Sequence, residues 1–129
     1  MIKQEIQSCL GVLNFTEEGR LSAEYTFPES FSGFQGHFPG NPVLPGVCQI
    51  LAALVMLEKH TGKALHLTSV ARARFLNTLG PDETLYIQGT YSANDPELSG
   101  KFQLVKRTDS GSVKVSNFSI NAEFYIPLN

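Results

Sequence analysis

The sequence predicts an α+β domain in which one buried helix packs against a single antiparallel sheet. Residues Gly46–His60 form a run with almost no polar side chain, as in a helix enclosed by other elements. About six other stretches are rich in β-branched and aromatic residues and are separated by Gly, Pro, Asp and Asn, as in hairpin-connected strands. A chain of 129 residues suffices for one domain with a real core, so we expect a single domain over residues 1–129.

The first predicted element is a hairpin, and the helix follows it. Lys3–Phe15 and Arg20–Phe27 flank Thr16–Gly19, whose composition is typical of a turn. Pro45 suits the first turn of the helix, and Gly62 lies where a helix would stop. The apolar residues of the helix cover several of its faces: Val47, Ile50, Leu51, Leu54, Val55, Met56 and Leu57.

Strands make up the rest of the chain. Four of them in hairpin-type succession cannot fully surround a helix that is apolar on several sides, so we expect a second protomer to complete the enclosure. Their predicted ranges are Leu65–Leu76, Glu83–Ser92, Lys101–Arg107 and Ser112–Ile126.

The last predicted strand contains a change of face. Val113 and Val115 occupy odd positions, whereas apolar residues from Phe118 onward occupy even ones. Because successive side chains in a strand point to opposite faces, this switch predicts a β-bulge near Ser116 and Asn117.

Composition excludes several classes of function. The net charge is −2 and the Lys and Arg residues form no basic stripe, so nucleic acid is not an expected partner. No apolar stretch is long enough to span a bilayer, and the amino terminus has no signal-peptide core, so we expect a cytoplasmic protein. Cys9 and Cys48 lack metal-ligand spacing and disulfide density, so we expect reduced thiols and no metal site.

The stretch GHFPGNPVLPGVCQ carries the main chemical signal, because it places one histidine, His37, in a stiff loop before the helix. At the helix start, Gly46 and Val47 would present free N–H groups beside the positive end of the helix dipole. A base beside such donors suits proton removal next to a carbonyl. The alternative is that His37 only caps a carbonyl in a turn. For His60 and His66 we favour structural roles.

The segment FQGHFPGNPVLPGVCQI resembles the active-site segment of the β-hydroxyacyl-acyl-carrier-protein dehydratases, which runs G-H-F-P-x-x-P-V-x-P-G-V before the central helix. Residues Val70–Leu76 and Leu79–Leu85 resemble a strand and turn of the same family. The resemblance implies a hotdog fold, in which a curled antiparallel sheet wraps around one long central helix. It also implies a dimer with its sheets joined edge to edge and an acyl tunnel at the interface.

The resemblance also implies roles for individual residues. His37 corresponds to the histidine that removes the C2 proton, and the N–H of Gly46 to the group that binds the thioester carbonyl. We expect no cofactor beyond the phosphopantetheine arm of an acyl carrier protein, or coenzyme A, which carries the substrate. The residues expected to line the substrate site are Phe38, Pro45, Gly46, Val47, Cys48 and Leu51.

Leu51 is a departure from the family pattern. The family places Glu or Asp fourteen residues after the histidine, and this acid is contributed across the dimer interface to protonate the leaving hydroxyl. Glu58 lies seven residues further, about 10 Å along the helix axis. Gln49 is displaced by about 200° around the helix. Cys48 shares the face of Leu51 by spacing, but a thiol in an apolar pocket is a poor acid.

Arg72 and Arg74 alternate with alanines on a predicted strand and should point to one face. There they would meet an acidic carrier protein or a phosphate; ordinary surface charge is the alternative.

These observations favour a 3-hydroxyacyl-thioester dehydratase of fatty-acid or polyketide-type synthesis, which forms a trans-2-enoyl thioester with His37 as base. Because of Leu51, three alternatives stay open. The acid comes from a different chain in a heterodimer, the protein is a thioesterase or an enoyl isomerase, or it is a non-catalytic acyl-binding subunit. The sequence does not choose between homodimer and heterodimer or between carrier protein and coenzyme A.

Overall fold

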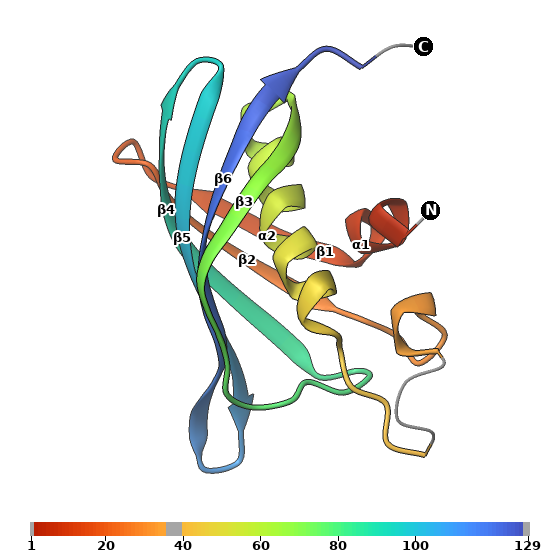
Figure 1. Cartoon of the computed structure of the whole chain (residues 1–129). Helices are drawn as coiled ribbons and strands as arrows, with labels where there is room; N and C mark the ends of the chain where they lie inside the picture. The colour runs from red at the N-terminus through yellow and green to blue at the C-terminus, as the bar shows by residue number, and fades with distance from the viewer. Residues whose placement is uncertain (1, 36–39, 128–129) are drawn as a thin grey trace.

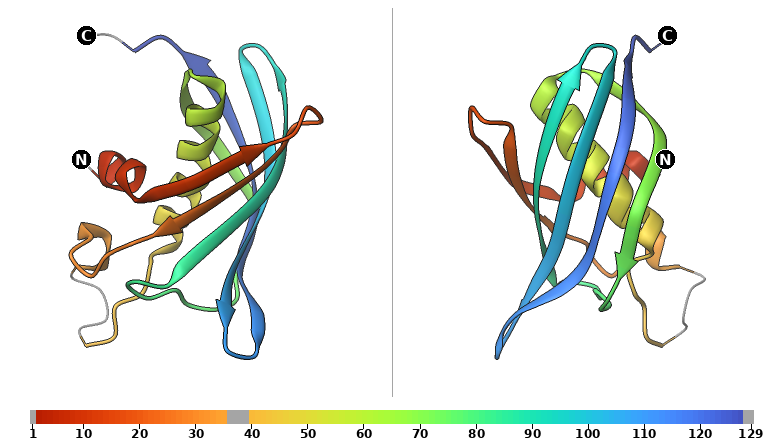
Figure 2. Two further views of the ribbon diagram at one scale, coloured as in Figure 1. Left: turned by 180° about the vertical axis from the view of Figure 1, so that it is seen from behind. Right: turned by 60° about the vertical axis from the view of Figure 1, so that its left-hand side comes forward.

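The computed structural model describes residues 2–35 and 40–127. Six strands form one antiparallel sheet in the order β1-β2-β4-β5-β6-β3, which curls around helix α2 (Figures 1 and 2). The helices are α1 (Ile2–Cys9), the short 3-10 helix η1 (Ser32–Phe34) and α2 (Gly46–Thr61). The strands are β1 (Leu10–Phe15), β2 (Arg20–Thr26), β3 (Ala64–Phe75), β4 (Thr84–Asn94), β5 (Glu97–Thr108) and β6 (Gly111–Tyr125).

Helix α2 begins and ends at the residues that punctuate it in the sequence. Pro45 is the N-cap with an extended backbone, and Gly62 adopts the left-handed conformation at φ 71° with its N–H bonded to the carbonyl of Glu58. A left-handed residue after the last turn is the usual way to end a helix, and glycine adopts it without strain. The predicted helix Gly46–His60 is therefore correct to one residue.

The amino-terminal prediction is wrong in part. Residues before Leu10 form α1 instead of the first half of a strand. Ile2 and Ile6 lie four residues apart and so share one helix face, and Ile6 is fully buried against the core. The predicted hairpin survives only as Leu10–Phe15 paired with Arg20–Thr26.

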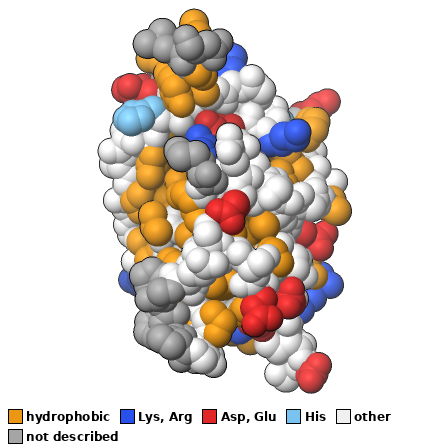
Figure 3. Space-filling view, turned by 90° about the vertical axis from the view of Figure 1, so that its right-hand side faces the viewer, with side chains coloured by type: hydrophobic (Ala, Val, Ile, Leu, Met, Phe, Trp, Pro, Cys, Tyr) orange, Lys and Arg blue, Asp and Glu red, His pale blue; other side chains and the backbone are white. Residues whose placement is uncertain are grey.

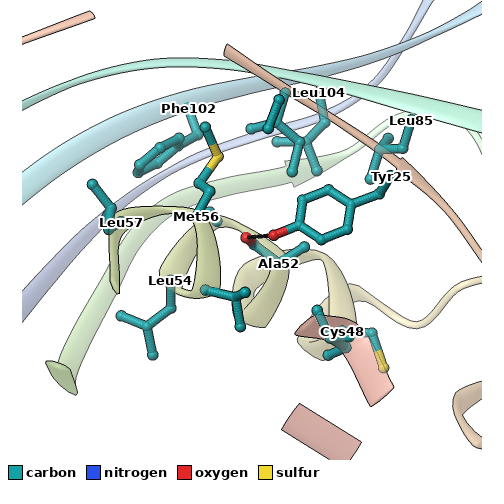
Figure 4. Packing of buried hydrophobic residues seen from close by; sticks show 14 of the residues in the cluster. Tyr25, Cys48, Ala52, Leu54, Met56, Leu57, Leu85, Phe102 and Leu104 are labelled. Carbon is teal, nitrogen blue, oxygen red and sulfur yellow. Dashed lines mark hydrogen bonds between the residues drawn. The ribbon is translucent and has the colours of Figure 1, made fainter. Parts of the chain in front are cut away.

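The core fills the space between α2 and the concave face of the sheet. Six consecutive residues of α2, from Ala52 to Leu57, are buried. Tyr25 of β2 donates a hydrogen bond from its hydroxyl to the carbonyl of Ala52 at 2.6 Å (Figure 4), and burial raises the pKa of this phenol. The bond ties the helix to the sheet where water is excluded.

The predicted β-bulge is present one residue earlier than expected. Leu104 of β5 pairs with Ser116, whereas the next residue, Val105, pairs with Lys114, so Val115 is the extra residue in β6. Val115 and Ser116 are consequently both buried. Strand β6 therefore turns two adjacent side chains toward α2.

A second bulge lies in the edge strand β3. Ala71 pairs with Ser119 and Arg74 with Asn117, which leaves one extra residue between them on β3. Arg72 has a positive φ of 55°, unusual for a residue with a side chain. The regular alternation on which Arg72 and Arg74 were predicted to share a face is interrupted here.

Candidate functional site: the first turn of helix α2

The first turn of α2 leaves two backbone donors free. The N–H groups of Cys48 and Gln49 donate to the carbonyl of Pro45 at 3.0 and 3.2 Å. Within residues 2–35 and 40–127, the N–H groups of Gly46 and Val47 have no backbone acceptor. Two free donors at the positive end of a helix can bind a carbonyl oxygen that gains negative charge.

A buried polar pair lies beneath this turn. The Ser116 hydroxyl donates to Gln49 Oε1 at 2.6 Å, and Gln49 Nε2 donates to the carbonyl of Leu44 at 3.2 Å. Gln49 is 3% exposed and Ser116 is 0% exposed. The N–H of Leu44 donates to the carbonyl of Leu79 at 2.7 Å. The segment before the helix is thus held at both polar groups of Leu44.

Gly46 lies directly against an aromatic ring of the edge strand. A Cβ built at Gly46 would lie 2.7 Å from Cζ of Phe75, closer than side-chain carbons approach one another. Phe75 is 50% exposed, and its ring covers one side of the helix start. Only glycine at position 46 permits this approach.

Position 51 lies on an apolar, partly open face of α2. Leu51 and Ile50 are half-buried, whereas Val47, one turn earlier, is 64% exposed. Figure 3 views the side of the molecule where α1 and α2 lie, and hydrophobic side chains are visible across it. The side chains of Val47, Ile50 and Leu51 are apolar and contain no proton donor.

The nearest carboxylate on the same helix is already engaged. Glu58 Oε1 forms an ion pair with Lys3 Nζ at 2.8 Å, and its Oε2 accepts the N–H of Leu65 at 2.8 Å. These bonds join α1, α2 and β3. Glu58 therefore anchors the far end of the helix.

Cys48 faces the core. It is 3% exposed, and its Sγ lies 3.0 Å from the position that a Cβ on Gly33 would take. Burial raises the pKa of the Cys48 thiol, with a smaller contribution from Glu5. Spacing alone placed Cys48 on the face of Leu51, but its thiol packs under η1.

Hydrogen bonds between Glu5 and Ser32 hold the chain shortly before the loop that contains His37. Ser32 donates its N–H to Glu5 Oε1 at 3.1 Å and its hydroxyl to Glu5 Oε2. These bonds hold the pKa of the Glu5 carboxyl below its usual range, because they favour the charged form. Helix α1 is thus bonded to η1.

The remaining residues singled out in the sequence do not belong to the first turn of α2. His37 and Phe38 lie outside the described residues. Arg72 and Arg74 are exposed on β3, where Arg72 lies in the bulge and Arg74 is the first paired residue after it. His60 Nε2 bonds to the Tyr91 hydroxyl at 3.0 Å at the opposite end of α2.

Two anchors were missed by sequence reasoning, the Gln49–Ser116 pair and the Glu5–Ser32 pair. Their partners lie 67 and 27 residues apart along the chain, so only the fold brings them together. The available signal for the first was Gln49 itself, a polar residue inside an apolar run.

Hollows in the surface lie away from this turn. One of about 780 Å³ lies between α1, β1 and the end of α2, near Lys3, Lys59 and Lys63. Another of about 640 Å³ is lined by residues of the sheet such as Arg20 and Lys101. Among the described residues, no helix is long and apolar enough to cross a membrane, and no three metal-binding side chains cluster.

Comparison with known protein families shows which family this chain belongs to. The ApeI-like family model, described as ApeI dehydratase, matches residues 14–116. The chain belongs to the ApeI-like dehydratase family. The match begins in β1 and ends at the buried Ser116, so it includes the first turn of α2 and the loop before it.

Curated relatives of this ApeI-like chain are 3-hydroxyacyl-[acyl-carrier-protein] dehydratases FabZ. The protein from Lactiplantibacillus plantarum is 40% identical over 80 residues, which cover 57% of this chain and 53% of the relative. The protein from Acetivibrio thermocellus is 32% identical over 100 residues, 68% of each chain. The chain thus spans about half of the first relative's length.

Solved structures share the hotdog fold. The dehydratase heterocomplex ApeI:P from Xenorhabdus doucetiae matches with a TM-score of 0.64 and 22% identity, covering 88% of this chain and 96% of that chain. The PaaI protein of E. coli matches with a TM-score of 0.63 and 14% identity, covering 95% and 92%. The expected fold class, a curled antiparallel sheet with a helix against it, is confirmed.

Proposed function

We propose that this ApeI-like chain is a 3-hydroxyacyl-thioester dehydratase that forms trans-2-enoyl thioesters in fatty-acid or polyketide-type chain building in the cytoplasm. The substrate is carried on an acyl carrier protein or coenzyme A. The observation that carries the proposal is the start of α2, which follows the GHFP segment and where the N–H groups of Gly46 and Val47 have no backbone acceptor among residues 2–35 and 40–127. Membership of the family supports the same reaction.

The reaction requires three groups, and this chain supplies two of them. His37 removes the C2 proton while the thioester oxygen takes up negative charge at the N–H of Gly46. The electron pair of the broken C–H bond then forms the C2–C3 double bond, and the C3–O bond breaks. The leaving hydroxide takes a proton and departs as water, and Leu51 cannot provide that proton.

The missing acid comes from a partner chain in our proposal. Leu51 is apolar, and the carboxylate of Glu58 is committed to Lys3 and Leu65. The likeness to a dehydratase heterocomplex supports a partner of different sequence. General acid help is commonly worth about 10²–10⁴ in rate, so the chain alone would dehydrate slowly.

Strand β3 is the proposed dimer edge. It has β6 as its hydrogen-bonded neighbour in the sheet, and every residue from Thr68 to Phe75 is exposed. An exposed edge strand offers unpaired N–H and C=O groups to another chain. Pairing there would bring the partner's helix toward the apolar face of Leu51.

The testing experiment follows both directions of the reaction by mass spectrometry. The purified chain is incubated with a 3-hydroxyacyl-carrier thioester or with its trans-2-enoyl product, beside a His37→Ala control. We expect slow interconversion that the control lacks, and a rise of about 10²-fold or more on addition of an acid-bearing hotdog chain from the same cell.

The products separate the alternatives. Release of free acid would favour a thioesterase, and a shifted double bond would favour an isomerase. If the complex turned over equally well with His37→Ala, the chain would be a non-catalytic acyl-binding subunit and the proposed function would be wrong.

A further inference from the structure

The buried pair of Gln49 and Ser116 is not explained by stability. A buried amide and hydroxyl contribute little net free energy when bonded, and apolar groups of the same shape at both positions would stabilise the fold about as well. Most of the surrounding core is apolar. A polar pair beneath the first turn of α2 therefore calls for another reason.

The hydrogen bonds of the pair fix the orientation of the Gln49 amide. The carbonyl of Leu44 can only accept, so the NH₂ group of Gln49 must face it at 3.2 Å. This leaves Oε1 toward Ser116, whose hydroxyl donates at 2.6 Å. The bulge in β6 lies at Val115 and Ser116, directly under this contact.

The same bonds determine where the N–H of Gly46 points. Leu44 is held on one side by Gln49 and on the other by Leu79. The ring of the intervening Pro45 fixes its φ at −62°, and its carbonyl accepts the N–H groups of Cys48 and Gln49, which restrains its ψ. Little rotation therefore remains between the held carbonyl of Leu44 and the N–H of Gly46. Phe75 closes the other side of Gly46.

We propose that Gln49, oriented by Ser116, is a positioning residue that aims the N–H of Gly46 at the carbonyl oxygen of the thioester. The inference rests on the proposed thioester-binding role of this turn. It adds a specific requirement for the amide of Gln49 and the hydroxyl of Ser116, neither of which touches the substrate.

The first test measures the carbonyl itself. A saturated acyl thioester labelled with ¹³C at the carbonyl is bound to the wild type, and its stretching frequency is recorded by infrared difference spectroscopy. A well-aimed N–H donor polarises the carbonyl and lowers that frequency. We expect Gln49→Met, which has similar volume and no amide, to bind the ligand with most of this lowering lost.

The second test uses turnover in the active assembly. We expect Gln49→Met and Ser116→Ala each to lower kcat by about 10–10²-fold with KM nearly unchanged, since small misplacement of a catalytic donor is costly. Tm should fall as well, because each substitution leaves a buried polar partner without its hydrogen bond. Because both act through one chain of bonds, the double variant should lose no more than the single variants. Ser116→Thr, which keeps the hydroxyl, should recover most of kcat.

Two results would overturn the inference. One is an unchanged carbonyl frequency in Gln49→Met, and the other is a kcat that stays low in Ser116→Thr although this variant recovers the wild-type Tm. Failure of the proposed dehydration is recognised separately, because the wild type would then bind the thioester with a lowered carbonyl frequency but form no enoyl product.

Discussion

The two ends of helix α2 are stabilised by different means. At the carboxyl end, Glu58 is paired with Lys3 and with the N–H of Leu65, His60 bonds to Tyr91, and Gly62 closes the last turn. At the amino end, the N–H groups of Gly46 and Val47 lack backbone acceptors among the described residues, and the support beneath them is the neutral pair of Gln49 and Ser116.

This difference separates anchoring from function. At the carboxyl end, the bonds of Glu58, His60 and Gly62 join the helix to neighbouring elements or close its last turn, and so they hold the helix in place. An end that keeps donors free, yet fixes their direction with buried neutral bonds, is prepared to bind something else. Gln49 and Ser116, the side chains bonded beneath the first turn, carry no charge.

The largest effect is expected from placing an acid on the amino-terminal half of the helix. When two copies of the variant pair with each other, Leu51→Glu should raise dehydration by about 10²-fold or more in the absence of the acid-bearing partner, because each copy supplies the missing proton donor to the other. Leu51 is half-buried on a partly open face, so the substitution is compatible with folding. Initial rates of enoyl formation measure the gain.

Leu51→Gln is the matched control, since it has nearly the same shape as the Glu variant and cannot transfer a proton. If the Gln and Glu variants are equally fast, the supply of an acid does not limit the rate of dehydration by this chain, and the prediction is wrong.

At the carboxyl end, the expected effect is on stability alone. Glu58→Ala leaves the N–H of Leu65 and the ammonium of Lys3 without their partner, and we expect a loss of about 1–3 kcal/mol in the free energy of unfolding. Chemical denaturation measures this loss. Per folded molecule, kcat should stay near the wild-type value.

Glu58→Gln tests the ion pair separately, because it retains an acceptor for the N–H of Leu65 and removes only the charge that pairs with Lys3. Its loss should be about 0–1 kcal/mol, as for other partly exposed pairs. A large fall in kcat with either variant would mean that the two ends are not functionally separate.

The smallest effect concerns Glu5, a charged anchor on the amino-terminal side. Its pKa is lowered by the two bonds from Ser32, so the folded state favours the carboxylate more than the unfolded state does. This contribution is fully present above the ordinary value of 4.5 and is lost as the pH falls below it. The Tm difference between wild type and Glu5→Gln should therefore shrink in acid.

Glu17 provides the control, as an exposed residue of the β1–β2 turn. Thermal melts from pH 7 to pH 3 should show a pH-dependent difference for Glu5→Gln and a flat one for Glu17→Gln. A flat difference for both would show that the Ser32 bonds do not link α1 to η1 in solution.

Local signals predicted much of this fold, and long-range pairing accounts for the rest. Helix α2 was found almost to the residue because Pro45 and Gly62 act on their immediate neighbours. The bulge in β6 was found within one residue because a change of face is visible in the strand itself. Helix α1 was missed because Ile2 and Ile6 show helical spacing over too few turns, and because the segment continues without a break into strand β1.

The candidate site was predicted less completely, for a related reason. The motif marks Gly46 as the donor, but nothing near Gln49 in the sequence indicates that Ser116 lies against it. The two arginines were expected on one face because strands alternate, and the bulge at Arg72 breaks that rule through pairing with β6.

The position of β6 in the sheet imposes an order on biosynthesis. Strand β3 leaves the ribosome long before β6, yet β6 is its hydrogen-bonded neighbour in the sheet. Until β6 is made, β3 has no strand of this sheet to pair with. The chain between β3 and β6, which contains β4 and β5, must then bring the two strands together before their hydrogen bonds can form. The edge proposed for partner binding is therefore built last, and a half-made chain cannot capture a partner through it.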